Sequence, residues 1–417
     1  MRGKHYRLMK RIAWIVGACG AFISELGHAQ ELEPDWISAR HAGMGFATAA
    51  TSNDSEAGFA NPAGLARMRN PRSRKMIHEI QFPRISVLGS EGNLQQVFEE
   101  LATKPEQAIE AGARNSRDSE NAATRIESRM YPSIVFGGKS AATWLFGLSG
   151  DLRTTILHSK EQTAQTFDIK QDNTIGGVLG VAGSSRGGTF SYGVSVRPNA
   201  RYFQSKVDAS LDSVNTNPGP SAMSLPRTIG IGLDAGILFT AADFWLPTIG
   251  LAVRNLPTGC APSIVNPYTG KEQTICGTLR TGSTAENEPR TKVDPMDLRL
   301  GVSMTPRFRL GPERLNLRLS AEASPLAIPQ GQTNYGVPDV PLDRMLKVGT
   351  ELYFGNPQTI SGLAFRGGIY LGEPTWGMTM SLWFLSLEYA SFVQQAQFRD
   401  KSLATLRQHL MSISTSL

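Results

Sequence analysis

Apolar and polar residues alternate with a period of two through most of this 417-residue chain, from about residue 76 onward. In the stretch 315–323, Leu315, Leu317 and Leu319 alternate with Asn316 and Arg318. A period of two places the apolar residues on one face of a β-strand, whereas an amphipathic helix repeats every three to four residues. The alternation therefore predicts an all-β protein.

The alternation alone would also fit a soluble β-sandwich, but two features favour a transmembrane barrel. The polar face is rich in glycine and in charges of both signs, whereas the other face carries large Met, Leu, Phe and Trp side chains. Long connections follow the odd-numbered strands as far as the ninth, and short ones follow the even-numbered strands. We predict an antiparallel barrel of about 14 strands over residues 73–417. The expected strands are 76–88, 130–138, 141–156, 173–184, 188–206, 225–240, 248–256, 293–304, 313–324, 343–355, 361–371, 375–383, 385–395 and 403–415.

The first 29 residues predict a signal peptide. Basic residues precede the apolar run 12–23, and Gly27 to Ala29 supplies small residues for cleavage after Ala29. That run is too short to span a bilayer as a helix, so the expected location is the bacterial outer membrane. A lipoprotein-like cleavage box at Val16 to Cys19 remains an alternative. The basic residues are Arg2, Lys4, Arg7, Lys10 and Arg11.

Much of the formal net charge of +6 belongs to this leader. Of the 42 basic and 36 acidic residues, five basic and one acidic lie in residues 1–29, so 37 and 35 remain and the mature net charge is +2. A nearly balanced charge offers no support for a nucleic-acid partner.

Two cysteines, Cys260 and Cys276, remain once Cys19 leaves with the leader. In an exported chain, an even pair within one loop-like stretch predicts a disulfide. A metal site with two thiolates is the alternative, but no histidine or further cysteine lies nearby in the sequence.

No motif in the chain predicts catalysis. Residues 136–140 (FGGKS) imitate a phosphate-binding loop, but the upstream glycine position is Ser133 and a strand follows instead of a helix. The chain has no His-Glu-x-x-His pattern. We therefore expect neither an enzyme nor a cofactor nor a metal site. The mature histidines are scattered, at His41, His78, His158 and His409.

The first long connection, residues 93–129, differs from the strands. Leu94, Val97, Phe98 and Leu101 recur at helical spacing. One or two short helices are expected there on the outer surface, either capping the rim or gating the barrel.

Charged residues gather on the polar face of the expected strands. They could pair across neighbouring strands and fill the barrel, or they could line a polar path for solutes. They must face away from lipid in either case. These residues are Asp151, Arg153, Asp234, Arg254, Asp297, Arg299, Arg318, Glu322, Lys347, Glu351, Arg366 and Glu388.

The region before the first strand resembles a known signature. The stretches 39–47 (ARHAGMGFA), Asn53-Asp54 and 61–65 (NPAGL) resemble the N-terminal segment of the FadL and PorV group of bacterial outer-membrane barrels. With later echoes at 232–236, 253–256, 366–368 and 387–390, the chain looks closest to the PorV and TraF-like branch.

The resemblance implies that residues 30–72 form a plug, or hatch, that folds into the barrel from the periplasmic side. Pro62 would fix a turn and Asn61 would cap it, while small residues would allow close packing in a narrow space. The plug motif comprises Gly43, Met44, Gly45, Asn61, Pro62, Ala63 and Gly64.

The resemblance leaves two functions open. FadL-like barrels carry small hydrophobic molecules through a plugged lumen, and PorV-like barrels hold exported proteins at the cell surface. We predict transport of a small hydrophobic molecule, with protein docking and a purely structural barrel as alternatives. No apolar inward stripe is evident in the sequence, which favours docking. The expected partners are outer-membrane lipid, the barrel-assembly machinery, and a hydrophobic small molecule or an exported protein.

Overall fold

The computed structural model describes most of the predicted barrel and a short segment before it. The described residues are 38–68, 77–90, 122–137, 142–158, 166–185, 188–210, 227–241, 245–265, 272–283, 292–306, 315–326, 328–330, 334–336, 342–355, 361–382, 384–397 and 403–415. The predicted signal peptide, the lipoprotein box at Cys19 and residues 93–121 of the connection 93–129 predicted to carry helices lie outside these ranges, whereas residues 122–129 of that connection form strand instead.

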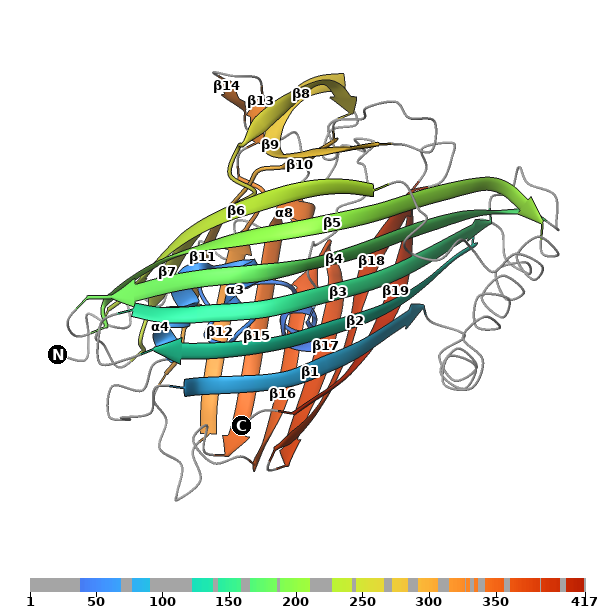
Figure 1. The fold of residues 1–417 in the computed structure, drawn as a ribbon. Coiled ribbons are helices and arrows are strands. Elements are labelled where there is room, and N and C mark those ends of the chain that lie inside the picture. Colours follow the sequence, from blue (N-terminus) through green and yellow to red (C-terminus); the bar gives the residue numbers. More distant parts are fainter. Residues whose placement is uncertain are drawn as a thin grey trace.

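Fourteen antiparallel strands close into a barrel (Figure 1). Each pairs with the next, and the ring closes because β1 pairs with both β2 and β19. All fourteen predicted strands correspond to wall strands, which confirms the predicted architecture. The wall strands are β1 (Ile77–Ser90), β2 (Ala122–Gly137), β3 (Ala142–His158), β4 (Thr166–Ser184), β5 (Phe190–Ser210), β6 (Arg227–Thr240), β7 (Thr248–Arg254), β11 (Asp297–Met304), β12 (Leu315–Ala323), β15 (Leu346–Gly355), β16 (Ser361–Tyr370), β17 (Glu373–Leu382), β18 (Leu385–Gln397) and β19 (Leu403–Thr415).

Two wall strands begin earlier than the alternation predicted. β2 begins at Ala122 instead of residue 130, and β4 begins at Thr166 instead of residue 173. The added part of β2 pairs with β3 from Ala122↔His158 onward. Polar residues such as Thr124, Arg125 and Glu127 dominate it, so the period-two signal fades although the backbone ladder continues.

Among the described residues, five further strands lie outside the ring of fourteen, at the top of Figure 1, and the alternation predicted only residues 293–295 of these, as the start of the strand 293–304. Among them β9 pairs with the start of β6, which extends that part of the sheet. The short helix α8 (Leu342–Met345) precedes β15. The five strands outside the ring are β8 (Gly259–Val265), β9 (Glu272–Ser283), β10 (Lys292–Pro295), β13 (Ile328–Gln330) and β14 (Asn334–Gly336).

The antiparallel pair of β8 and β9 places Cys260 directly opposite Cys276 along the backbone. The predicted strand 293–304 is divided into β10 and β11 at Met296, immediately after Pro295. Proline has no backbone N–H for a ladder hydrogen bond, which explains an interruption at this point.

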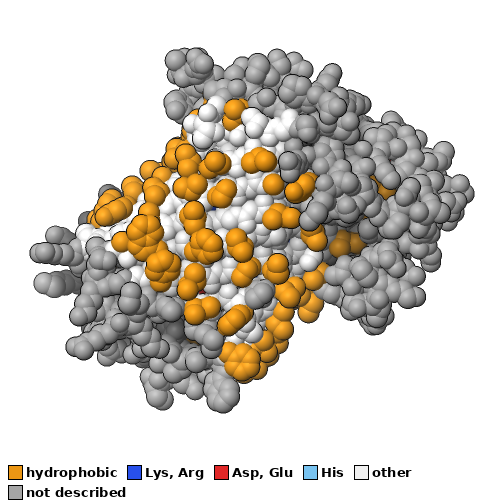
Figure 2. All heavy atoms as spheres, in the orientation of Figure 1, with side chains coloured by type: hydrophobic (Ala, Val, Ile, Leu, Met, Phe, Trp, Pro, Cys, Tyr) orange, Lys and Arg blue, Asp and Glu red, His pale blue; other side chains and the backbone are white. Residues whose placement is uncertain are grey.

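Large apolar side chains cover the outer face of the wall. In β3, Trp144, Phe146 and Leu148 are about half exposed, whereas the residue before each of them is buried. Figure 2 shows hydrophobic side chains spread across the wall, with no cluster of charged side chains among them. Such an outer face suits hydrocarbon instead of water. Among the described residues, no helix has the length and apolar character needed to cross a membrane.

A segment before the first strand lies inside the ring of strands, where Figure 1 shows it in blue. We call residues 38–68 the inner segment. Its helical turns are short, and nearly all of its residues are buried. The helical turns are α2 (Ala39–Gly43), α3 (Ala57–Ala60), the 3₁₀ turn η1 (Pro62–Gly64) and α4 (Leu65–Met68).

The outward orientation of the apolar face can be tested at Leu148, which is 54% exposed near the middle of β3. We expect Leu148→Arg to destabilise the barrel by about 2–4 kcal/mol in lipid, because a cation would then face hydrocarbon. Reversible unfolding from vesicles would measure this difference. The control Leu148→Phe keeps an apolar side chain and should unfold like the wild type. Equal stability of the Arg variant would contradict an outward Leu148.

Candidate functional site

The inner segment packs against glycines on the inner face of the wall. Gly45 has a φ of +60°, and a Cβ there would lie 2.5 Å from the carbonyl oxygen of Val348. A Cβ on Gly193 would lie 2.5 Å from the carbonyl carbon of Pro62. The segment and the wall therefore approach backbone to backbone, which larger residues would prevent. Wall glycines that face the segment in this way are Gly193, Gly236, Gly250, Gly301, Gly349, Gly368 and Gly377.

Asn61 ties the two halves of the inner segment together. Its side-chain oxygen accepts a hydrogen bond from the Ala63 amide at 3.1 Å, which caps η1. Its side-chain nitrogen donates to the Ala49 carbonyl at 2.6 Å. The side chain is fully buried, so both bonds replace contacts with water that are no longer possible.

The other motif residues also lie at close contacts. The carbonyl of Gly43 accepts a hydrogen bond from Thr375 Oγ1 at 3.3 Å. The carbonyl of Met44 lies against Gly349, and Gly64 lies against the backbone of Ser52.

Glu322 of β12 binds the middle of the inner segment. One of its carboxylate oxygens accepts hydrogen bonds from the backbone amides of Thr48 at 2.6 Å and Ala49 at 2.7 Å. The other oxygen lies 3.5 Å from Lys347 Nζ. Bonds to a buried charge are about twice as strong as those between neutral groups. Glu322 therefore fixes the segment to the wall.

Glu351 of β15 gathers three arginines. Arg318 and Arg366 approach it from the neighbouring strands, at 3.1 and 2.9 Å. Arg40 of the inner segment approaches it with two nitrogens, each at 3.2 Å. Arg40 also binds Asp54, at 2.5 Å, so the segment and the wall share one ion-pair network.

Burial alone would raise the pKa of the Asp54 carboxyl, but nearby positive charges, Arg40 foremost, together outweigh burial and hold that pKa below its ordinary value. A second arginine, Arg84 of β1, binds Glu56 of the segment and lies 3.8 Å from Glu388. The two carboxylates, Asp54 and Glu56, are therefore each paired with an arginine.

Other charged residues named from the sequence form ion pairs within the wall. Asp151 and Arg153 pair at 3.2 Å, and Asp297 and Arg299 at 2.6 Å. Asp234 pairs with Arg197 at 2.6 Å. Arg254 is buried, opposite Asp297 in the ladder.

Several partners of these charges escaped the sequence analysis. Arg40, Asp54 and Glu56 precede the first strand, where no alternation assigns an inward face. Arg84 follows Pro83, and the register between β1 and β2 shifts between Gln81 and Arg84. A bulge of this kind breaks the period-two pattern, so the inward direction of Arg84 could not be derived from it.

An apolar stripe on the inner face contradicts the expectation that none exists. Leu88, Leu410 and Ala390 are direct cross-strand neighbours on β1, β19 and β18, and all three are buried. We call them the apolar stripe. On β19, Leu410 lies between the buried polar residues Gln408 and Ser412, so that strand by itself does not reveal the stripe.

Phe46 of the inner segment covers this region. Its ring lies 4.5 Å from that of Tyr370 and 5.6 Å from that of Phe392, centroid to centroid. These aromatic rings and the apolar stripe belong to one buried cluster. On the opposite side of the segment, Phe59 packs on Tyr131 at 5.3 Å within a second apolar cluster.

The role of Asn61 can be tested by Asn61→Ala. The substitution leaves the Ala63 amide and the Ala49 carbonyl without these partners, which should cost about 1–3 kcal/mol. We expect faster amide hydrogen exchange throughout residues 46–64 in the folded barrel. Asn199→Ala, a wall residue, is the control and should leave exchange in this segment unchanged. Unchanged exchange in Asn61→Ala would show that the side chain does not hold the segment.

Comparison with known proteins places the fold. No family model matches the chain, and no curated protein matches it in sequence. Among solved structures, a deltaS2 mutant of the monoaromatic hydrocarbon channel TodX matches with a TM-score of 0.52 and 11% identity, covering 92% of this chain and 99% of that one. A deltaS2S3 mutant of TodX gives 0.50 and 10%, covering 91% and 98%. The toluene transporter TbuX of Ralstonia pickettii gives 0.48 and 13%, covering 92% and 98%.

At such low identity the likeness concerns the fold. It confirms the predicted FadL-type barrel fold over nearly the whole length of both chains. The finer assignment to the PorV-like branch stays a prediction. The chain thus has the fold of the FadL-type hydrocarbon channels.

Proposed function

We propose that this barrel transports small hydrophobic molecules across the outer membrane, with residues 30–72 acting as a movable plug. The apolar stripe is the observation that carries the proposal. It gives an otherwise charged lumen a surface on which a hydrocarbon can lose its contact with water. In the closed state Phe46 occupies that surface, so a ligand and Phe46 would compete for it.

The TodX structures support the class of ligand. TodX is described as a monoaromatic hydrocarbon channel, and aromatic rings would suit contact with Tyr370 and Phe392 at the offset and edge-on geometries that such rings prefer. We therefore propose a monoaromatic hydrocarbon such as toluene as the first ligand to test.

The lumen charges do not oppose this proposal, because many of them are paired. Glu351, Glu322 and Asp234 each have a basic partner within 3.5 Å. Paired charges leave less free charge to order water. The ion pairs would shape the channel and hold the plug, and the apolar cluster would contact the ligand.

The plug is attached to the wall by bonds that can re-form elsewhere. Arg40 and the backbone amides of Thr48 and Ala49 bind wall carboxylates, and Thr375 and Ser303 bind its carbonyls. Water could replace each of these partners as the segment moves. We propose that export by the signal peptide 1–29 and insertion by the barrel-assembly machinery precede this function.

Docking of an exported protein remains the alternative from the sequence. Nothing in the described residues favours it, whereas the apolar stripe favours transport. Capture of an exported protein together with an absence of hydrocarbon binding would reverse this preference. A structural barrel would show neither property.

Movement of the plug can be tested with an engineered disulfide, Ala49→Cys with Gly301→Cys. A Cβ on Gly301 would lie 3.1 Å from the Ala49 Cβ, close to the separation of about 3.5–4.5 Å found in disulfides. We expect the oxidised variant to lose most uptake of radiolabelled toluene by intact Gram-negative host cells, because the segment is then fixed to β11. A reductant should restore uptake.

The matched controls are the two single variants, which cannot form this bond and should transport in both redox states. Uptake by the fully cross-linked protein equal to that of the reduced protein would contradict a movable plug. Uptake by wild-type cells no faster than by cells without the protein would contradict transport itself.

We also propose the disulfide between Cys260 and Cys276 as a brace for the β8–β9 pair, since the register sets these residues opposite one another. Mass spectrometry of the unreduced protein should find the peptides containing the two cysteines joined. Cys260→Ser should abolish this species and leave a free thiol at Cys276. Two free thiols in the wild-type protein would rule the disulfide out.

A further inference from the structure

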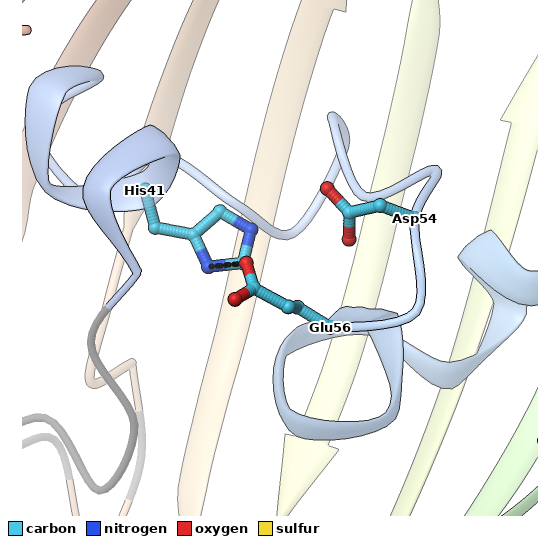
Figure 3. Close-up of side chains that lie close together, drawn as sticks. All are labelled: His41, Asp54 and Glu56. Carbon is cyan, nitrogen blue, oxygen red and sulfur yellow. Dashed lines mark ion pairs between the residues drawn. The ribbon is translucent and has the colours of Figure 1, made fainter. Parts of the chain in front are cut away.

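Three side chains of the inner segment converge on one point, as Figure 3 shows. His41 comes from α2, Asp54 from the loop that follows, and Glu56 from the residue before α3. One ligand atom from each lies within 4.8 Å of those of the other two, and His41 Nδ1 is 4.0 Å from Glu56 Oε2. No role in the closed plug described above requires a histidine at this place.

Two atoms of the cluster lack hydrogen-bond partners. His41 is only 5% exposed, and its Nε2 has none. Asp54 binds Arg40 through Oδ2, but its Oδ1 also has none. A buried polar atom without a partner is costly, and an unseen ion is one of the explanations such atoms call for. An imidazole nitrogen and a carboxylate oxygen are both metal-binding atoms.

The backbone holds His41 in place. The Ser38 side chain accepts a hydrogen bond from the His41 amide at 3.1 Å, and the His41 carbonyl accepts one from the Phe46 amide at 2.8 Å. A ligand held in this way loses little freedom when it binds a metal.

Each of the two neighbouring arginines has a second carboxylate partner, so neither depends on Asp54 or Glu56 alone to balance its charge. Arg40 also binds Glu351, and Arg84 also lies near Glu388. If a cation took the carboxylates of Asp54 and Glu56, each arginine would keep one wall partner. The cost of separating these ion pairs would be correspondingly smaller.

We propose that His41, Asp54 and Glu56 bind a divalent transition metal ion, with Zn²⁺ as the best fit. One imidazole and two carboxylates are a common type of ligand set for zinc, with water completing the tetrahedron. Mg²⁺ and Ca²⁺ prefer oxygen ligands alone and fit less well. Zinc–ligand bonds of about 2.0–2.1 Å at the tetrahedral angle would set neighbouring ligands about 3.3 Å apart. From separations of up to 4.8 Å, ligand atoms need to approach one another by up to about 1.5 Å, within reach of side-chain rotation.

A bound ion would join α2 to the Asp54–Glu56 turn and so lock the fold of the inner segment. The metal site itself does not depend on transport. Its consequence does rest on the proposed function: zinc would hold the plug in its closed shape, and removal of zinc would loosen it.

The test is zinc titration of the full chain, purified in detergent without a polyhistidine tag and stripped with a chelator. Calorimetry should show one saturable equivalent of Zn²⁺, and elemental analysis should confirm the ratio. We expect His41→Gln and Asp54→Asn each to weaken binding at least tenfold, because each removes one of three ligands. The Co²⁺ complex of the wild type should absorb in the visible range as a tetrahedral site does.

The matched controls are His409→Gln and Asp297→Asn, a histidine and an ion-paired aspartate of the wall, which should bind zinc like the wild type. Heat-dependent gel mobility identifies the variants that fold. Should His41→Gln or Asp54→Asn fail to fold, the zinc affinity of Glu56→Gln and the Co²⁺ spectrum of the wild type test the site instead. The absence of a saturable equivalent, or unchanged affinity in the folded site variants, would overturn the proposal. Because no hydrocarbon is present, this outcome is independent of transport.

Discussion

The hydrogen bonding of the backbone in lipid governs the whole structure. Hydrocarbon offers no partner for a free N–H or C=O group, so strands can cross it only as a closed ring. Here the pairing of β1 with β19 completes that ring. Closure of the ring fixes which residues face the interior, because alternate residues of every strand must then point into a confined lumen. The lumen must be filled by side chains, by water or by another part of the chain.

The inner segment meets this demand with two kinds of contact. Small residues let the backbone of the segment approach glycines of the wall, as Gly45 approaches Gly368. Charged residues of the segment form ion pairs with charged residues of the wall. Glu322 and Glu351 bind both wall residues and the segment. Some of the charges that fill the barrel therefore also position the segment. The apolar cluster around Phe46 is the exception, and it is the surface that would suit a hydrophobic ligand.

Much of the wall was predictable because lipid outside and a polar lumen inside impose a strict period of two. The strand around Leu148 alternates without interruption, and its two faces could be assigned from the residues alone. Prediction failed where that constraint lapses. Polar residues occupy the early part of β2 on both faces, and a register shift before Arg84 breaks the pattern. The apolar stripe was missed because Leu88, Ala390 and Leu410 are neighbours only across strands.

The sequence by itself determined an all-β chain with about 14 alternating segments and a small-residue segment ahead of them. These properties follow from residue order, since alternation and helix spacing are local. Only the tertiary structure decided which charges meet, which inward residues form the apolar stripe, and that His41, Asp54 and Glu56 converge. Such contacts join residues as far apart as Arg40 and Glu351, and barrel register brings them together by relations that no local pattern encodes.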